Sequence, residues 1–280
     1  MKLIECPRDA MQGIHEFIPT QKKADYINQL LKVGFDTIDF GSFVSPKAIP
    51  QLRDTAEVLS KLELKNTKSK LLAIVANVRG AEEACKFPEI HYLGFPLSIS
   101  EQFQLRNTNK TIDQALEIVA DIQHLCRKHG KVLVTYISMG FGNPYEEPYD
   151  EKVVTEFVAK LDDLDVEIVS LADTIGAAQP ELIKRVFEAN ISAFPNLEFG
   201  AHFHSMPHTA KEKIEAALDA GCKRFDSAIR GYGGCPMAKD DLTGNIATEK
   251  LLVSLSDFEL KIDQAEFDKA IQMSVDVFPM

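Results

Sequence analysis

Eight short runs rich in β-branched and aromatic residues alternate with longer helical patterns along the whole chain, and this alternation limits what the chain can fold into. Repeated strand and helix units form a parallel sheet, because each helix carries the chain back to the start of the next strand. Eight units are the number that closes a (β/α)8 barrel, whereas a doubly wound sheet rarely repeats the unit so evenly. The sequence therefore predicts an α/β fold of the TIM-barrel type. The predicted strands are 3–5, 37–40, 71–75, 90–94, 132–137, 168–171, 199–203 and 224–227.

The segments between the predicted strands have the apolar spacing of amphipathic helices. One is expected to begin near Thr20 and end at Gly34, and a longer one to begin at Thr111 and end at Gly130. The segment 246–280 also has a helical pattern and is expected to pack on the barrel as a C-terminal extension, so that residues 1–280 form one catalytic domain. Further helices are expected around 56–62, 81–85, 153–161, 180–189 and 209–220.

Composition narrows the classes of function. The 280 residues include 31 lysines and arginines against 42 aspartates and glutamates, for a formal net charge of -11. Binding to a nucleic-acid backbone requires a concentrated basic surface, so no nucleic-acid partner is expected. The polar start of the chain is unlike a signal peptide, and no run approaches the apolar length of about 18 residues that suggests a membrane span. The five cysteines form no C-x-x-C pair, and a cytoplasmic protein without a disulfide framework is expected.

Reactive side chains gather where the predicted strands end, which is where barrels of this type carry their active sites. Because the carboxyl ends of all eight strands meet at one face, residues far apart in the sequence are expected to lie close together there. These residues are Arg8 and Asp9 after the first strand, Asp39 in the second, Asp173 after the sixth, His202 and His204 in the seventh, and Cys235 and Asn245 after the eighth.

The run His202-Phe203-His204 is the strongest physical signal, because the two-residue period of a strand places both imidazoles on one face. In isolation, an H-x-H run more often supplies hydrogen-bonded pocket residues than metal ligands, but its position at a strand end of a barrel favours a metal site. Asp9 and Asn245 would complete a set of nitrogen and oxygen ligands. Such a set suits Mg²⁺ or Mn²⁺, although imidazoles also admit Zn²⁺, Fe²⁺ or Co²⁺.

The other candidate residues allow two interpretations each. Arg8 and Asp9 form either a surface ion pair or a metal ligand beside a cation that stabilises a developing enolate oxygen. Asp173 is equally suited to cap a helix and to act in the site. The glycine-rich loop 231–236 either approaches a phosphate with its backbone or presents Cys235 for proton transfer.

The chain resembles the 3-hydroxy-3-methylglutaryl-CoA lyases, a family within the metallolyase barrels that carry an Arg-Asp-x-x-Gln motif. The resemblance covers nearly the whole chain, and its motifs occur in the order of the family. The Ser-Phe-Val-Ser-Pro-Lys and Gly-Gly-Cys-Pro motifs are characteristic of the lyase branch. The matching segments are 7–12, 42–47, 170–176, 202–204, 233–236 and 244–249.

The resemblance implies cleavage of 3-hydroxy-3-methylglutaryl-CoA to acetyl-CoA and acetoacetate, as in leucine breakdown, with an acyl-CoA as the small-molecule partner. Family analogy also implies a homodimer. It implies that a divalent cation binds to Asp9, His202, His204 and Asn245. The catalytic residues would be Arg8, which stabilises the enolate, the mobile thiol Cys235, Asp173 and Asp39, and the substrate contacts would be Arg8, Gln12, Gly233 and Gly234.

Three departures from the family pattern bear on the substrate. The lyases have glutamate at the position of Asp39, so a water or a shifted backbone is expected to make up for the missing methylene. Ser205 follows the His-x-His run in place of the usual aspartate, and Gly13-Ile14 replaces Asn-Glu. Because of these changes, the sequence does not define the acyl group of the substrate. The alternatives are a related retro-aldol lyase, a Claisen-type acyl-CoA synthase, which usually has a longer C-terminal region, and a non-catalytic acyl-CoA-binding barrel.

Overall fold

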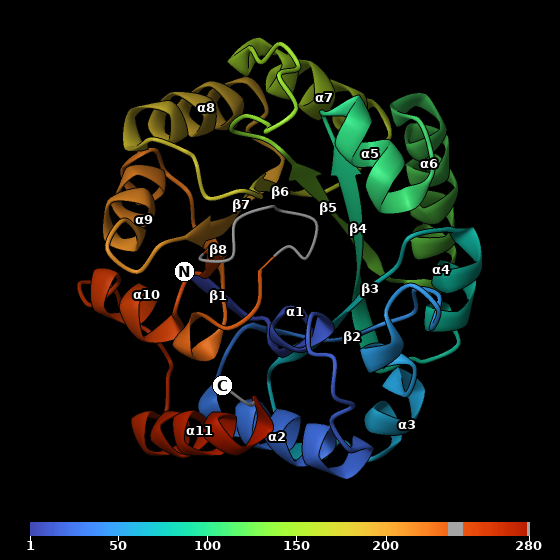
Figure 1. Ribbon diagram of the computed structural model, residues 1–280, viewed down its shortest axis with the longest axis vertical. Helices are drawn as coiled ribbons and strands as arrows, with labels where there is room; N and C mark the ends of the chain where they lie inside the picture. The colour runs from blue at the N-terminus through green and yellow to red at the C-terminus, as the bar shows by residue number, and fades with distance from the viewer. Residues whose placement is uncertain (235–242, 279–280) are drawn as a thin grey trace.

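The computed structural model describes residues 1–234 and 243–278, and its eight main strands form a closed parallel barrel (Figure 1). The barrel closes because β1 pairs in parallel with both β2 and β8. The predicted TIM barrel is therefore confirmed, and every predicted strand is present. The strands are β1 (Lys2–Glu5), β2 (Thr37–Ser42), β3 (Lys70–Ile74), β4 (Ile90–Ser98), β5 (Val132–Ser138), β6 (Ile168–Asp173), β7 (Glu198–Ser205) and β8 (Arg224–Ser227).

A ring of helices surrounds the barrel, as Figure 1 shows. Its members are α2 (Thr20–Val33), α3 (Thr55–Ser60), α4 (Val78–Cys85), α6 (Ile112–His129), α7 (Glu151–Asp163), α8 (Pro180–Ala193), α9 (Ala210–Asp219) and α10 (Thr248–Ser254). The predicted ends of α6 are confirmed, because Thr111 forms a capping box and Gly130 has a left-handed φ of 65°. Across the described parts of the chain, no helix combines the length and apolar character required to span a membrane.

Short elements that the sequence pattern did not predict lie in the connections. The helices α1 (Pro7–Gln12) and α5 (Glu101–Thr108) follow the carboxyl ends of β1 and β4, and β9 (Gly244–Asn245) pairs with β7. Three 3₁₀ turns complete the elements: η1 (Pro50–Leu52), η2 (Leu64–Asn66) and η3 (Ile229–Gly231). All the short elements except η2 follow the carboxyl end of a strand, where the candidate residues gather.

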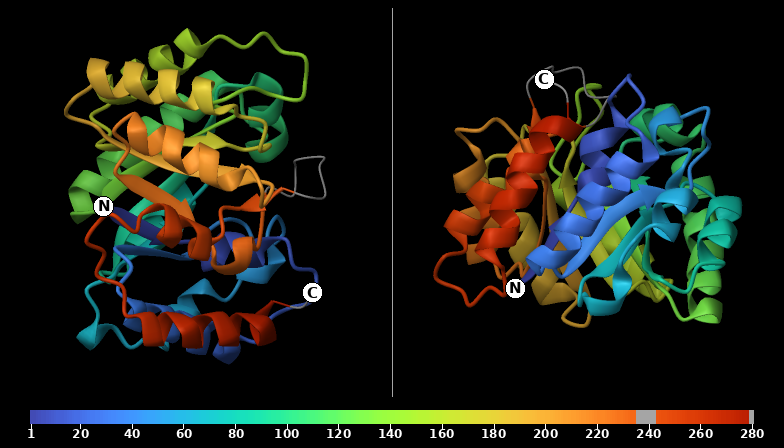
Figure 2. Two further views of the ribbon diagram at one scale, coloured as in Figure 1. Left: turned by 90° about the vertical axis from the view of Figure 1, so that its left-hand side faces the viewer. Right: turned by 90° about the horizontal axis from the view of Figure 1, so that it is seen from below.

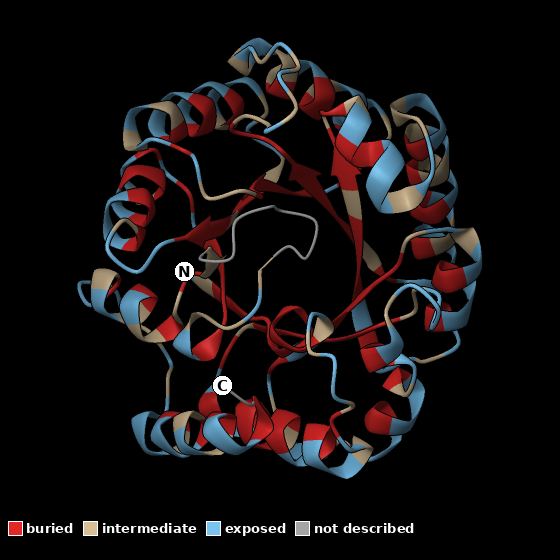
Figure 3. Cartoon of the chain, viewed as in Figure 1, coloured by how far each residue is buried: buried red, intermediate tan, exposed pale blue. Residues whose placement is uncertain are grey.

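The main apolar core lies between the strands and the helix ring. Figure 3 shows that the helices turn their buried sides toward the strands and their exposed sides outward. A second, smaller apolar cluster fills part of the barrel interior, and it includes Leu72, Tyr92, Val134, Tyr136 and Ile168. Because the interior is packed with side chains, a ligand has room only at an end of the barrel.

The C-terminal segment forms two helices rather than one, since residues 255–263 separate α10 from α11 (Gln264–Val277). The helix α11 packs along α2 (Figure 2). Phe267 meets Phe35 edge to face with ring centroids 6.3 Å apart, and Phe278 meets Tyr26 in the same way at 5.5 Å. Aromatic pairs of this geometry add to the stability gained from burial. The expected helical extension is therefore present on the barrel, with a break that was not predicted.

Candidate metal centre and active site

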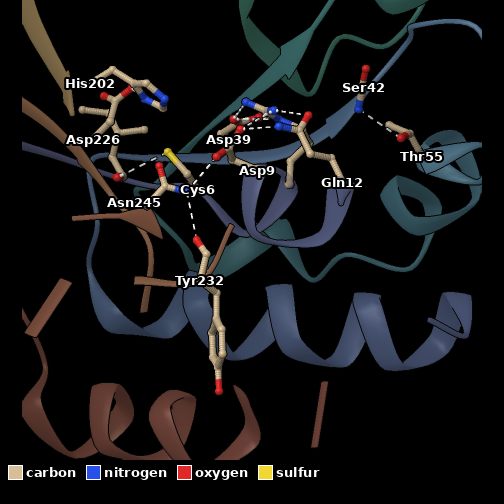
Figure 4. A network of polar contacts seen from close by, with 12 residues as sticks. Cys6, Asp9, Gln12, Asp39, Ser42, Thr55, His202, Asp226, Tyr232 and Asn245 are labelled. Carbon is tan, nitrogen blue, oxygen red and sulfur yellow. Dashed lines mark hydrogen bonds and ion pairs between the residues drawn. The ribbon is translucent and has the colours of Figure 1, made fainter. Parts of the chain in front are cut away.

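Three side chains with metal-binding atoms meet at the carboxyl end of the barrel. One ligand atom each of Asp9, His202 and His204 lies within 4.8 Å of the other two. Alternation along β7 directs both imidazoles to one side, as predicted, and α1, which begins at Pro7 directly after β1, brings Asp9 to them. We call these three residues the Asp–His–His cluster. Figure 4 shows Asp9, His202 and several of their neighbours.

Each histidine of the cluster is oriented through its Nδ1 atom. His202 Nδ1 lies 3.1 Å from Asp226 Oδ2, and His204 Nδ1 lies 2.9 Å from the carbonyl oxygen of Thr174. A histidine that donates through Nδ1 presents the lone pair of Nε2 to a ligand. His204 Nε2 is buried and has no hydrogen-bond partner among the described residues. An unpaired acceptor directed at this cluster fits a divalent cation.

Asn245 joins the cluster from the other end of the sequence. The antiparallel pairing of β9 with β7 places Asn245 opposite His204. Its Nδ2 atom donates to Asp9 Oδ2 at 2.7 Å and to the carbonyl oxygen of Tyr232 at 2.9 Å. These contacts use the amide nitrogen and leave the amide oxygen for a hard cation. The structure thus brings together all four residues expected to hold the metal, and their binding of a cation stays a prediction.

The Arg8 guanidinium is almost fully engaged by neighbouring side chains. Nε and Nη2 donate to Asp39 Oδ2 at 2.9 and 2.5 Å, and Nη1 donates to Asp9 Oδ1 at 2.8 Å and to Gln12 Oε1 at 2.9 Å. Gln12 in turn donates to Asp9 Oδ1 at 2.7 Å. These four bonds use four of the five N–H groups of an arginine, and they leave one Nη2 hydrogen for a ligand. The interpretation of Arg8 and Asp9 as a simple surface pair is wrong, because both residues are buried.

Asp39 reaches Arg8 directly, so no bridging water is needed to replace the methylene of a glutamate. The register between β2 and β3 shifts immediately after Asp39, between this residue and Gly41. Burial raises the pKa of Asp39 to about 6, although the Arg8 guanidinium opposes that shift. Burial acts in the same direction on Asp9, but Arg8 and His202 outweigh it and hold the pKa of that carboxyl below its usual range.

The loop after β8 approaches the cluster closely. Gly233 has a φ of 87°, and a Cβ atom there would lie 2.7 Å from the carbonyl oxygen of Asp9 and 2.9 Å from Asn245 Nδ2. Gly234 has a φ of 136°, and a Cβ atom there would lie 2.5 Å from the carbonyl oxygen of Thr243. Both positions therefore require glycine. Their contact with substrate stays a prediction, and Cys235 lies outside the described residues.

Asp173 faces away from the cluster. Its carboxylate accepts hydrogen bonds from the backbone N–H groups of Ala177 and Ala178 at 3.0 and 3.1 Å, and from Lys213 Nζ at 2.6 Å. Neither Asp173 nor Asp39 is among the residues that line the cavity described next. Asp173 does not cap α8, because Ala177 and Ala178 precede that helix and its N-cap residue, Gln179, makes no side-chain capping bond. A catalytic role for Asp173 stays a prediction.

A cavity of about 590 Å³ opens over the cluster. Arg8, Gln12 and the Asp–His–His cluster form part of its lining. The rest of the wall is mainly apolar and comes from the segments after β1 and β2 and from α5, including Ile14, Phe17, Val44, Ile49 and Phe103. A mostly apolar cavity with a few convergent polar groups is typical of a small-molecule site.

Two residues of this region were missed by the sequence reasoning. Asp226 is buried on β8 and orients His202. An available signal was the charged pair Arg224 and Asp226, two residues apart on a predicted buried strand. Lys213 on α9 is also buried, but nothing in the helical pattern distinguishes it from a surface lysine.

The barrel and its site define a class of protein: a (β/α)8 barrel with a candidate divalent-cation site where the strands end. The chain belongs to the HMGL-like family, whose model matches residues 3–275.

Several known proteins are similar to this chain over most of its length. Hydroxymethylglutaryl-CoA lyase YngG of Bacillus subtilis is 34% identical over 91% of this chain and 84% of its own. The 3-hydroxy-3-isohexenylglutaryl-CoA/hydroxymethylglutaryl-CoA lyase of Pseudomonas aeruginosa is 33% identical over 93% of this chain and 86% of its own. Among solved structures, an Acinetobacter baumannii HMG-CoA lyase in complex with coenzyme A and 3-methylmalate superposes with a TM-score of 0.91. It is 31% identical and aligns with 99% of this chain and 91% of its own.

Proposed function

We propose that this protein is a divalent-cation-dependent carbon–carbon lyase that cleaves 3-hydroxy-3-methylglutaryl-CoA to acetyl-CoA and acetoacetate. The observation that carries the proposal is that Arg8 and the Asp–His–His cluster line one cavity. The Arg8 guanidinium and a divalent cation held by the Asp–His–His cluster would place two positive charges in this cavity. Such a pair suits a substrate in which a hydroxyl group and a thioester lie a few atoms apart. The similarity to hydroxymethylglutaryl-CoA lyases over most of both chains supports the same substrate.

The reaction breaks the bond between the carbinol carbon and the methylene carbon next to the thioester. The hydroxyl loses its proton, its oxygen becomes the ketone of acetoacetate, and the electrons of the broken bond form the enolate of acetyl-CoA. A cation bound by the Asp–His–His cluster and Asn245 would acidify and orient that hydroxyl. Protonation of the enolate carbon then balances the proton lost by the hydroxyl.

Arg8 is the residue placed to hold the enolate oxygen. Its bonds to Asp39 and Asp9 fix the guanidinium plane, and the remaining Nη2 hydrogen can donate to the developing negative charge. Asp39 contacts Arg8 rather than the cavity, so we assign it the positioning of Arg8. This assignment accounts for the direct Arg8–Asp39 bonds despite the shorter side chain.

Cys235 is proposed as the acid that protonates the enolate carbon. The support is the position of Gly233 and Gly234, whose contacts with Asp9 and Thr243 bring the chain that leads to Cys235 up to the cluster. We also propose that the two glycines contact the substrate, because Gly233 lies against Asp9, which lines the cavity. Gln12 is proposed as a substrate contact because it lines the cavity itself.

We further propose Mg²⁺ or Mn²⁺ as the cation, because two of the four proposed ligands are oxygens and none is a thiolate. A cytoplasmic location and a homodimer are proposed from the composition and from family analogy. Sedimentation of the purified protein at several concentrations tests the dimer.

The first test is the release of acetoacetate from 3-hydroxy-3-methylglutaryl-CoA by chelator-stripped protein, with and without added Mg²⁺ or Mn²⁺. Metal-dependent release supports the lyase. Cation binding without any release contradicts the proposed substrate, and it favours another hydroxyacyl thioester or a non-catalytic acyl-CoA-binding barrel. A Claisen-type synthase would instead join acetyl-CoA to an oxo acid, which the reverse assay measures.

A further inference from the structure

Lys213 contacts the backbone of His204 and is not among the residues that line the cavity. It extends from α9, and its Nζ atom contacts Asp173 Oδ2 at 2.6 Å, the carbonyl oxygen of Gly176 at 2.7 Å and that of His204 at 3.2 Å. Both side chains of the ion pair are almost fully buried, with 3% and 2% of their areas exposed. An ammonium group has three N–H donors, and these three acceptors match them.

The segment that Lys213 holds also orients His204. Residues 174–179 connect β6 to α8, and the carbonyl oxygen of Thr174 in this segment lies 2.9 Å from His204 Nδ1. The Thr174 hydroxyl accepts a hydrogen bond from the N–H of Met139 at 2.8 Å. Lys213 contacts the chain on both sides of Thr174, at Asp173 at the end of β6 and at Gly176 in the segment, and it also contacts the backbone of His204 itself.

We propose that Lys213 is a positioning residue for the cation site. It joins the strand that carries His204 to the segment whose carbonyl oxygen accepts from His204 Nδ1, and so keeps Nε2 directed at Asp9 and His202. Asp173 acts with Lys213 as its counter-ion. This inference rests on cation binding by the Asp–His–His cluster, which is part of the proposed function, and it does not depend on the identity of the acyl-CoA.

The physical reason is that the ring orientation and the tautomer of a metal-ligating imidazole depend on the group that its other nitrogen contacts. Loss of such an outer contact typically weakens metal binding by about 10–100-fold. The partner of His204 is a backbone carbonyl, which no substitution can remove. Lys213 is the side chain that contacts both β7 and the segment that carries the Thr174 carbonyl. A substitution of Lys213 can therefore weaken the contact between His204 Nδ1 and this carbonyl oxygen.

A matched control lies at the opposite end of the barrel. Lys131 is also buried, and its Nζ atom donates to the carbonyl oxygens of Ile90 at 2.6 Å and Phe87 at 2.8 Å. Lys213→Met and Lys131→Met each remove a buried ammonium group from backbone carbonyls. If Lys213 only stabilised the fold, the two substitutions would act alike on the cation site.

The test measures the binding of Mn²⁺ to chelator-stripped protein by electron paramagnetic resonance, with the folded fraction of each variant monitored by thermal unfolding. We expect Lys213→Met to raise the Kd for Mn²⁺ at least about tenfold and Lys131→Met to change it less than about twofold. The ¹⁵N signals of the His204 ring should show one tautomer in the wild-type protein and a mixture in Lys213→Met. Wild-type Mn²⁺ affinity in a folded Lys213→Met protein overturns the inference.

Lys213→Met leaves the Asp173 carboxylate buried without a counter-ion, which is costly for the fold. The double variant Lys213→Met/Asp173→Asn removes both charges and serves if the single variant does not fold. Weak Mn²⁺ binding by the folded double variant supports the inference, and wild-type affinity overturns it. A wild-type protein that binds Mn²⁺ but releases no acetoacetate contradicts the proposed substrate alone, whereas one that binds no Mn²⁺ overturns the cation site and this inference together.

Discussion

The two ends of the barrel use buried charge differently. At the amino end, the buried Lys131 donates to two backbone carbonyl oxygens, and the buried Arg224 pairs with Glu198 at 3.3 Å. Lys2, which is partly exposed, also pairs with Glu198, at 2.5 Å. At the carboxyl end, His204 Nε2, Asp39 Oδ1 and Asp226 Oδ1 are buried without a hydrogen-bond partner in the described parts of the chain. Arg224 is a partial exception at the amino end, since its Nε and Nη2 atoms also lack a partner.

The comparison shows that the fold tolerates more unpaired polar atoms at the carboxyl end of the barrel than at the amino end. Each buried, unsatisfied polar group costs about 1–3 kcal/mol, so native proteins keep few of them. Of the three atoms at the carboxyl end, His204 Nε2 belongs to a residue that lines the cavity, so it is the one that a ligand there can satisfy. The amino end, where most charges have protein partners, serves the stability of the barrel, as is usual for this fold.

Removal of a proposed ligand should have the largest effect. His204→Ala deletes the unpaired Nε2 atom, and we expect cation-dependent acetoacetate release to fall by more than about 10³-fold, because a Lewis acid contributes several kcal/mol. Calorimetric titration with Mn²⁺ should show the loss of binding. Full metal-dependent activity in this variant would mean that His204 Nε2 does not bind the cation.

Glu5 tests whether a buried carboxyl group at the carboxyl end of the barrel can also serve the fold. Its carboxylate accepts from the N–H of Ile229 at 2.8 Å and from the hydroxyl of Thr248 at 2.6 Å, and burial raises its pKa to about 8. The folded protein therefore holds a proton that the unfolded chain, with a glutamate pKa near 4.5, has lost. The contribution of Glu5 to stability is fully present below about pH 4.5 and is lost as the pH rises to about 8.

Glu5→Gln removes this titration. We expect the free energy of unfolding of the wild-type protein to fall by about 2–4 kcal/mol more than that of the variant between pH 5 and pH 8. Urea unfolding at several pH values measures the difference. Parallel pH profiles for the two proteins would show that the Glu5 carboxyl is ionised in the fold across this range.

Asp226→Asn should have a smaller effect on the metal centre, because it removes the charge next to His202 Nδ1 and retains an acceptor. We expect the Kd for Mn²⁺ to rise by about 10–100-fold. Asp54→Asn is the control, since Asp54 is a partly buried carboxylate, with 8% of its side chain exposed, that pairs with Lys23 at 2.7 Å. Equal effects of the two substitutions would argue against a specific role for Asp226.

The smallest effect is expected at the amino end. Lys2→Ala breaks the partly exposed pair with Glu198, and such pairs contribute about 0–1 kcal/mol. Acetoacetate release should stay unchanged, and thermal unfolding should shift by only a few degrees at most. A loss of activity in this variant would contradict the conclusion that the charges at the amino end serve only stability.

Much of the fold could be predicted because strand and helix periods are local signals. The short helix α1 could not, since its six residues are too few to show a period. The break before α11 left one signal that was not used: the Asp263 side chain caps this helix by accepting from the N–H of Glu266, which is a typical helix start. The assignment of residues 1–280 to a single domain stays a prediction.

The site could be predicted in part because a barrel brings all strand ends to one face. Asp9, His202 and His204 were found from their positions in predicted strands and loops. Lys213 and the carbonyl of Thr174 could not be found in this way. Their contacts depend on how α9 and the segment after β6 pack across β7, and no spacing along the chain encodes that packing.

The hydrogen bond between Asp9 and Asn245 joins residues 236 positions apart in the sequence. Translation proceeds at about 5–20 residues per second, so Asn245 is synthesised about 12–47 s after Asp9. A growing chain can form the early strands during that interval, but it lacks the last member of the proposed ligand set. A chain released early by a premature stop codon before this point would therefore lack a complete cation site, however well its earlier units had folded.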